Sequence, residues 1–279
     1  MVLAAGLAVG WTAALARSKA EPPAFPYATF SANEEVANWL IEYDWVAWKA
    51  SDLVMAEPEE QLARLGPHWF CFRDARGWHA LFGRYEAKSN VYQQELHYLR
   101  RGDEMVRTAD LVDPALASRY GRALQTARAE LPPEITKLPV AFNHYVRPIE
   151  GDKLEVWVLP AMQRDQTLVF GGDVRYVLDS SGAKILERVL NFKEFRAAKP
   201  DASLELNIDR QENDVPSVGD IFFIQQFGRQ FKSVSVWTHC FLTRLIDSEG
   251  KELAWIHVQK QSPECEGKPS KRPRGAKAP

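Results

Sequence analysis

The stretch "VLDSSGAKIL" (Val177–Leu186) contains an aspartate followed three residues later by a glycine, between two runs in which apolar and polar residues alternate. The same Asp-x-x-Gly spacing returns in "FRDARGWHALF" at Asp74–Gly77 and in "LIDSEGKELAWI" at Asp247–Gly250. Aspartate at the first position of a turn accepts hydrogen bonds from backbone amides two residues on, and glycine adopts the left-handed conformation without steric cost. Alternation with a period of two is typical of strands. Each stretch therefore predicts two antiparallel strands joined by a tight turn, so its aspartate reverses the chain and holds no substrate.

Three functional interpretations of these turn segments fail. A GTPase switch also contains Asp-x-x-Gly, but it requires a phosphate-binding Gly-x4-Gly-Lys-Ser/Thr loop, which the sequence lacks. Ser181–Lys184 and Ser248–Lys251 spell the Ser-x-x-Lys of penicillin-binding enzymes, in which the serine begins a buried helix. In a hairpin turn these side chains point to water instead. Arg101–Asp103 has the letters of an adhesion tripeptide, but it also lies where a turn is expected.

The wider pattern predicts an α+β fold, in which antiparallel β-meanders pack with two or three helices in the N-terminal half. One helix is expected from Ser31, which forms a capping-box pattern with Glu34, and another begins near Pro114. Pro132–Pro139 is the best internal boundary. It separates a helix-plus-meander domain at 31–131 from a β-rich domain at 140–260. Strands in the second domain are expected at Val140–Arg147, Leu154–Pro160, Thr167–Val177, Ala183–Leu190, Leu204–Asp209, Ile221–Phe227, Ser233–Ile246 and Leu253–Val258.

A weak internal repeat links the two halves of the chain. The segment that begins at His68 aligns with the segment that begins at His144, with small gaps. In this alignment His68 falls on His144, Trp78 falls on Trp157 and Tyr98 falls on Tyr176. If the repeat is real, it predicts two similar antiparallel sheets, although chance similarity competes with this interpretation.

The first residues of the chain predict export, and the last residues predict a disordered tail. Residues 1–18 resemble an export signal, because Met1–Ala16 carries no charge and ends in a small-x-small cleavage pattern, although the usual positive start is missing. A helix over Met1–Ala16 would reach only about 24 Å, short of the roughly 30 Å hydrocarbon core. We therefore expect a periplasmic or secreted protein of bacterial type, with no transmembrane domain beyond an uncleaved signal. Residues 19–30 form a proline-rich linker, and residues 261–279 are predicted to be a disordered basic tail.

Cysteine and histidine are too scattered to form a recognisable metal motif. An odd count of three cysteines excludes complete pairing, although Cys71 and Cys240 are a conceivable pair because each lies in a predicted strand. The weak metal candidates are His239, Cys240 and His257, since a turn at Asp247–Gly250 would place them on facing strands. Two facing ligands do not close a site, so we expect no metal and no cofactor.

Glu95 and His97 form a second weak group, beside Arg100 and Arg101. These residue types can perform acid–base chemistry, but they are also typical of an ordinary solvated strand face. We favour the solvated strand face.

The composition gives few indications of function. A formal net charge of −2 provides no field that attracts nucleic acid, so we expect no sequence-specific nucleic-acid partner. Most of the nine tryptophans lie in apolar periodic segments, but Trp39, Trp45 and Trp48 share one predicted helix and are candidates for partner binding. We therefore expect a non-enzymatic binding or assembly module that meets an unknown protein or a cell-envelope component. The alternatives are a hydrolase with catalytic residues dispersed in sequence, or a glycan or small-molecule binder that uses tryptophan.

Overall fold

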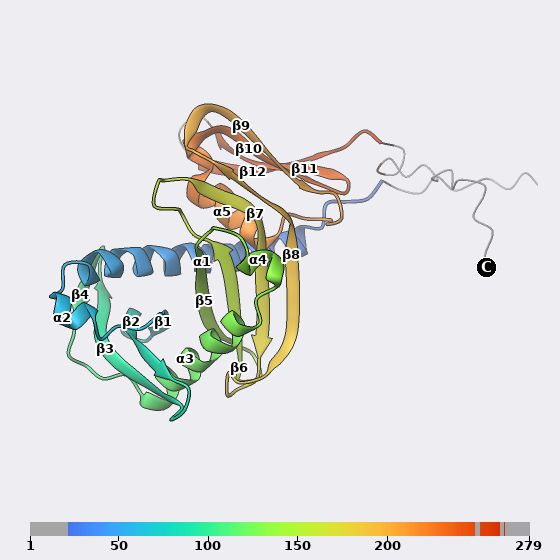
Figure 1. Ribbon diagram of the computed structural model, residues 1–279. Helices are drawn as coiled ribbons and strands as arrows, with labels where there is room; N and C mark the ends of the chain where they lie inside the picture. Colours follow the sequence, from blue (N-terminus) through green and yellow to red (C-terminus); the bar gives the residue numbers. More distant parts are fainter. Residues whose placement is uncertain (1–21, 249–251, 263–264, 266–279) are drawn as a thin grey trace, which may run out of the picture.

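The computed structural model describes residues 22–248, 252–262 and 265, which form an α+β fold of three four-stranded sheets and few helices (Figure 1). The fold class predicted from the sequence is confirmed. The helices are α1 (Tyr27–Val54), α2 (Glu59–Leu62), α3 (Pro114–Ala129), α4 (Pro133–Thr136) and α5 (Val218–Phe227), followed by the 3-10 turn η1 (Gly228–Gln230). The strands are β1 (His68–Asp74), β2 (Gly77–Glu86), β3 (Val91–Arg101), β4 (Glu104–Arg107), β5 (Phe142–Ile149), β6 (Lys153–Pro160), β7 (Leu168–Leu178), β8 (Ile185–Ala198), β9 (Asp201–Arg210), β10 (Phe231–Thr238), β11 (Phe241–Ser248) and β12 (Glu252–Gln259).

The first two sheets are antiparallel meanders with the same connectivity. Their strand orders are β1-β2-β3-β4 and β5-β6-β7-β8. The pairs matched in the sequence alignment fall on equivalent strands: His68 and His144 on β1 and β5, Trp78 and Trp157 on β2 and β6, and Tyr98 and Tyr176 on β3 and β7. The weak repeat therefore follows the strand order of two similar sheets.

The third sheet has the order β12-β11-β10-β9, and its β9–β10 pair is parallel. Parallel neighbours need a crossover, and α5 with η1 supplies it. The predicted strand at Ile221–Phe227 is therefore wrong, because these residues form most of α5. The helix begins at a capping box, in which the Ser217 hydroxyl accepts from the Asp220 amide and the Asp220 carboxylate accepts from the Ser217 amide. The predicted long strand Ser233–Ile246 is divided into β10 and β11 at His239–Cys240.

Helix α1 runs along one side of the first two sheets (Figure 1). It begins at Tyr27, four residues before the predicted start, and Pro26 precedes it without a side-chain cap. The Ser31 capping box is therefore wrong, and the end of the predicted linker is helical. The reason is tertiary, because Phe25 and Phe30 are buried against aromatic residues of the third sheet. The inward face of α1 carries residues at helical spacing: Ala37, Leu40, Tyr43, Val46, Ala47, Ala50 and Val54.

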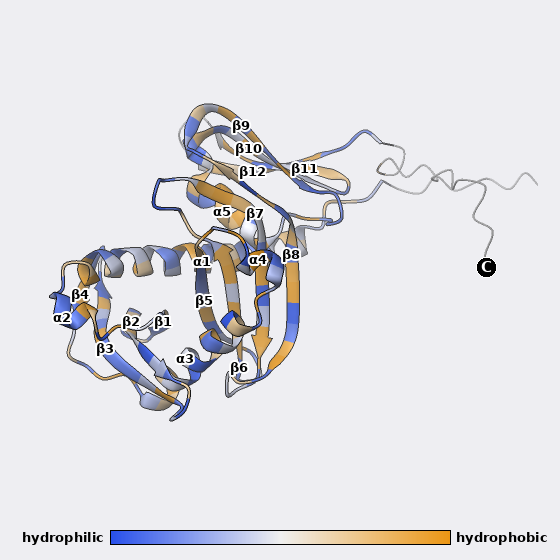
Figure 2. Cartoon of the chain, viewed as in Figure 1, coloured by the Kyte–Doolittle hydropathy of each residue, from blue (hydrophilic) through white to orange (hydrophobic). Residues whose placement is uncertain are grey.

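Helix α3 fills the space between the first and second sheets. The Asp113 side chain caps it at the Ala115 amide (2.9 Å), with Pro114 in the first turn as predicted. Its apolar face joins a core that includes Phe70 of β1 and Val156 of β6. Figure 2 shows mostly hydrophobic residues along β7, which is buried over nearly its whole length in this layered core.

Two of the three Asp-x-x-Gly stretches are turns in the described structure. The Asp74 carboxylate accepts from the Arg76 amide at 2.7 Å, and Gly77 has φ +121°. The Asp179 carboxylate accepts from the amides of Ala183 and Lys184 at 3.0 and 3.1 Å, between β7 and β8. The third stretch joins β11 to β12, but residues 249–251 lie outside the described residues. The turn interpretation is thus confirmed at Asp74 and Asp179.

Candidate functional site

A pocket of about 320 Å³ opens where α1 passes the β1–β2 and β3–β4 turns. Helix α1 contributes a carboxylate, and the ends of β1 and β3 each contribute an arginine next to the turn that follows. The buried indole of Trp78 lies among them. We call this pocket the groove, and its lining residues are Glu42, Arg73, Gly77, Trp78, Arg100 and Gly102.

The polar groups of the groove are held in place by one another. Trp78 Nε1 donates to Glu42 Oε2 at 2.9 Å, and Arg73 Nη1 lies 3.6 Å from the same oxygen. Arg100 Nε donates to the Gly102 carbonyl oxygen at 2.9 Å. The lining residues include two guanidinium groups and one carboxylate, and Arg100 Nη2 also lies 3.9 Å from the exposed Asp103 carboxylate. Guanidinium groups bind carboxylates through two parallel hydrogen bonds, so the groove suits an acidic ligand group.

The three helix tryptophans differ in their exposure and in their contacts with residues that line the groove. The Arg100 guanidinium carbon is 4.3 Å from the centroid of the Trp45 ring. Trp48, one turn further along α1, has 56% of its surface exposed, and Lys49 Nζ lies 4.8 Å from its ring centroid. Trp39 and Trp45 are both partly buried against the core, and the Trp39 ring lies 5.9 Å from that of Trp78, which lines the groove. The structure therefore separates the predicted set by exposure, since Trp48 is exposed and the other two are partly buried.

The tryptophans of the later strands are mainly structural. Trp157 is buried, and Trp237 donates its Nε1 to Asn207 Oδ1 at 3.0 Å. These two residues form no concave aromatic cluster with the helix tryptophans. Trp48 on α1 is therefore the member of the predicted helix set that is exposed to solvent.

The predicted facing of His239 or Cys240 with His257 is wrong. The register of β11 and β12 places Thr243 opposite His257. The two strands pair as far as Ser248 and Glu252, so the chain reverses later than the turn expected at Asp247–Gly250. The Thr243 hydroxyl lies 3.0 Å from His257 Nδ1, and the His257 ring stacks on Phe25. Among the residues described by the structure, no three histidine, cysteine or acidic side chains are grouped to hold a metal ion.

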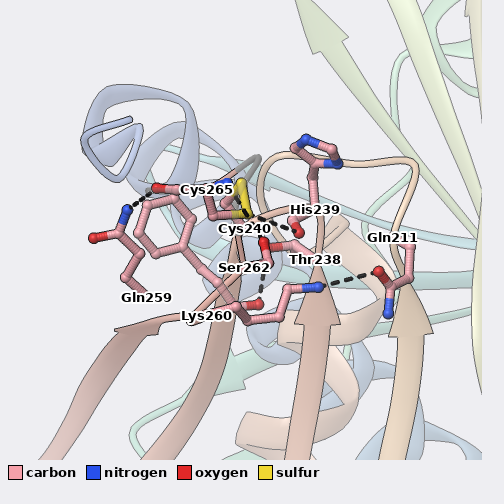
Figure 3. The surroundings of a disulfide bond; sticks show 9 residues. Gln211, Thr238, His239, Cys240, Gln259, Lys260, Ser262 and Cys265 are labelled. Atoms are coloured by element: carbon pink, nitrogen blue, oxygen red, sulfur yellow. Dashed lines mark hydrogen bonds between the residues drawn. A yellow bond between two sulfur atoms is a disulfide. The ribbon is translucent and has the colours of Figure 1, made fainter. Parts of the chain in front are cut away.

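Cys240 bonds to Cys265, and not to Cys71 as the sequence left open (Figure 3). The two Cα atoms are 5.3 Å apart, and Cys265 is 2% exposed. Cys265 lies in the predicted tail, and the bond fastens this residue to the end of β10. The free thiol of Cys71 is buried under α1, where its backbone amide donates to the Tyr43 hydroxyl at 2.8 Å. The Cys240 thiol is therefore not available as a metal ligand or nucleophile in this structure.

A hydrogen-bonded histidine pair, which the sequence did not reveal, lies inside the first sheet. His79 Nδ1 is 2.8 Å from His97 Nε2, and both side chains are buried. His79 Nε2 lies 2.8 Å from Asp74 Oδ1, and His97 Nδ1 lies 2.9 Å from the Asp110 carbonyl oxygen. His97 is thus not on a solvated strand face, as the sequence had indicated. The two histidines are diagonal neighbours on β2 and β3, a relation that appears only when the strand register is known.

The environment sets the charge of Asp74 and His97 in this series of hydrogen bonds. Burial lowers the pKa of His97, and the positive charge of Arg76 contributes in the same direction. Partial burial works against ionisation of Asp74, but hydrogen bonds from His79 and Arg76 outweigh it and lower the pKa of this carboxyl. Asp74 is therefore a carboxylate near neutral pH, and His97 favours the neutral state.

Burial of His144 on β5 should make the folded protein less stable in acid. Burial, with the nearby charge of Arg128, lowers the pKa of His144 from 6.5 to about 3, and its Nε2 is buried without a partner. Between these values the unfolded chain binds a proton that the folded chain cannot bind, so stability falls as the pH falls below 6.5. We expect this residue to cost about 2 kcal/mol between roughly pH 7 and pH 5.

Urea denaturation at both pH values measures this loss. His144→Gln removes the titrating ring and should show a smaller loss than the unchanged protein. His239→Gln, at an exposed histidine, is the control and should show the same loss as the unchanged protein. Equal losses in all three proteins would contradict the assignment to His144.

Comparisons with known proteins provide no family for this chain. No protein-family model matches it, and neither curated proteins nor solved structures include a match. Within the described part of the chain, no helix has both the length and the apolar character needed to cross a membrane.

Proposed function

We propose that the protein is an exported, non-enzymatic binding or assembly module, and that it docks an acidic segment of a partner protein on the groove and the neighbouring Trp45 and Trp48. The observation that carries this proposal is the position of an exposed aromatic surface next to two arginines. Protein interfaces are enriched in tryptophan and arginine. The partner is a protein or another component of the cell envelope that presents a carboxylate.

The chemistry of the groove favours binding over proton transfer. The carboxylate of Glu42 accepts from Trp78 Nε1 and lies 3.6 Å from Arg73 Nη1, so both neighbours already engage it. The indole of Trp78 is buried, so it offers no ring face for stacking with a sugar. These observations favour the docking module over the hydrolase and the glycan binder.

The disulfide supports the exported location. Structural disulfides form and persist in oxidising compartments and are rare in the reducing cytosol. The Cys240–Cys265 bond is buried at both ends, as expected of a structural bond. A periplasmic or secreted site is therefore part of the proposal.

Site-directed photo-crosslinking in cells that produce the full chain tests the docking site. A photoreactive phenylalanine analogue in place of Trp48 should form a discrete adduct with a partner. The same analogue in place of Leu186 on β8, which is 47% exposed, is the control and should not form that adduct. Arg73→Ala with Arg100→Ala should reduce the adduct at least about tenfold, because each charged hydrogen bond contributes roughly 1.5–3 kcal/mol.

Substitution of an arginine outside the groove tests whether the adduct is lost because the groove is altered or because the protein has lost positive charge in general. Arg84 is exposed and lies on β2, well away from the groove turn at Gly77. Arg84→Ala should leave the adduct unchanged. An adduct that resists the double arginine substitution, or that forms equally at both probe positions, would contradict docking at the groove.

A further inference from the structure

The buried histidine pair is connected to a segment that covers it. Neighbouring residues in a strand point to opposite faces, so His79 lies on the face of the first sheet away from the Trp78–Glu42 contact. On that face the segment Thr108–Val112, which we call the strap, leads from β4 towards α3. The strap is held by four hydrogen bonds to β3. The Thr108 amide donates to the His97 carbonyl oxygen (2.9 Å) and the Val112 amide donates to Gln94 Oε1 (3.0 Å). The Asp110 carbonyl oxygen accepts from both His97 Nδ1 (2.9 Å) and Gln94 Nε2 (2.8 Å).

The series of hydrogen bonds from Asp74 through the two histidines to Asp110 requires an extra proton. It contains three hydrogen bonds, and each bond needs one hydrogen. A carbonyl oxygen donates none, so the hydrogen of the last bond belongs to His97 Nδ1. One carboxylate and two neutral imidazoles have only two hydrogens between them. With all three bonds formed, the series therefore holds one proton more than its neutral rings supply.

The surroundings place this proton on the histidines, next to a negative charge. His79 is the ring that contacts the Asp74 carboxylate, with Nε2 2.8 Å from Oδ1, and His97 lies one ring further away. The charged groups that face the pair are Asp74 from β1, Arg76 from the β1–β2 turn and Asp110 from the strap. Arg76 bridges the two carboxylates, with Nε 3.3 Å from Asp74 Oδ2 and Nη1 3.0 Å from Asp110 Oδ2. Phe72 stacks on the His79 ring and completes the enclosure.

We propose that Asp74, His79 and His97 form a proton-binding site, and that its bound proton holds the strap on the first sheet. Loss of this proton leaves two hydrogens for three bonds, so one bond must be given up. The bond between His79 and the Asp74 carboxylate is charge-assisted and is the stronger one. The bond that is lost is the neutral one from His97 to the Asp110 carbonyl oxygen, which loosens the strap as the pH rises and leaves Gln94 Nε2 as the remaining donor to that oxygen. The switch is independent of docking at the groove.

Nuclear magnetic resonance of the full chain labelled with nitrogen-15 tests this switch. At low pH we expect His97 to carry its hydrogen on Nδ1 and His79 to carry hydrogens on both nitrogens. Between roughly pH 5 and pH 9 the pair should lose one proton in a single step. Over the same step the hydrogen-exchange protection factors of the Thr108 and Val112 amides should fall about tenfold, because one hydrogen bond of the strap is lost. Amides of β6 in the second sheet provide the internal reference.

Two variants test the assignment to these residues. Asp74→Asn keeps an oxygen that accepts from the Arg76 amide, so the turn is preserved, but it removes the negative charge. It should move the loosening of the strap to lower pH. His79→Gln removes one titrating ring and should abolish the pH step, whereas His239→Gln at the exposed site should leave it unchanged. Protection factors of the strap that do not vary with pH, or a step that Asp74→Asn does not move, would overturn the proposal.

Discussion

Arg210→Met is expected to lower the free energy of unfolding by about 3–5 kcal/mol, because it leaves a buried carboxylate without its partner. Arg210 Nε and Nη2 bind the two oxygens of Asp220 at 2.8 and 3.0 Å. The two residues are only 2% and 1% exposed. The pair connects β9 to the first turn of α5, so its loss also weakens the crossover of the third sheet.

A second carboxylate increases this cost. Asp173 on β7 is buried, and it accepts from the Gly219 amide of α5 at 2.9 Å. Burial raises the pKa of Asp173, and the negative charge of Asp220 contributes in the same direction. Without the Arg210 guanidinium, these two acidic groups lose the cation that binds Asp220 in their shared buried site.

Urea denaturation at neutral pH measures the loss. Arg210→Met together with Asp220→Asn should recover part of it, since the stranded charge is then removed. Lys232→Met provides the control, because Lys232 forms a solvent-exposed ion pair with Glu205 and should change stability little. An Arg210→Met protein as stable as the Lys232→Met protein would show that the buried pair does not hold α5.

Replacing both disulfide cysteines with serine is expected to lower the free energy of unfolding by about 3 kcal/mol. Cys240 and Cys265 are separated by 25 residues, and a crosslink across a loop of this size restricts the unfolded chain by about that amount. Residues 260–262 lead from β12 to this bond, and the Gln259 side chain donates to the Cys265 carbonyl oxygen. We expect this segment to detach from the third sheet when the bond is absent.

Thermal or urea denaturation with and without a reductant measures the effect. Reduction should lower the stability of the unchanged protein to that of Cys240→Ser with Cys265→Ser, and it should leave the variant unaffected. Alkylation of thiols in protein taken directly from cells, after denaturation, should label Cys71 alone. Labelling of all three cysteines in that material would contradict both the bond and the exported location.

The local chemistry of the turns was predictable from the sequence. Aspartate and glycine at Asp74–Gly77 and Asp179–Gly182 act within a few residues, so they form the expected turns whatever packs around them. Alternating apolar residues likewise indicated strands and an α+β fold. The capping box at Ser217 was also readable, but the aromatic, β-branched run after it was interpreted as a strand.

The start of α1 and the candidate site depended on partners distant in sequence. Helix α1 begins early because Phe25 and Phe30 pack on the third sheet. The groove combines residues from α1 and two separate turns, and the histidine pair depends on the register of β2 and β3. The partner of Cys240 was decided in the same way, by where the end of the chain returns.

The sequence alone was enough for features that act over one turn of helix or one hairpin, because the responsible atoms are covalent neighbours. Strand register, the partial burial of Trp39 and the exposure of Trp48 were decided only in the folded protein. A shift in register changes which side chains meet, although the pattern of apolar and polar letters remains the same. The groove, the proton-binding pair and the disulfide therefore arise from tertiary packing.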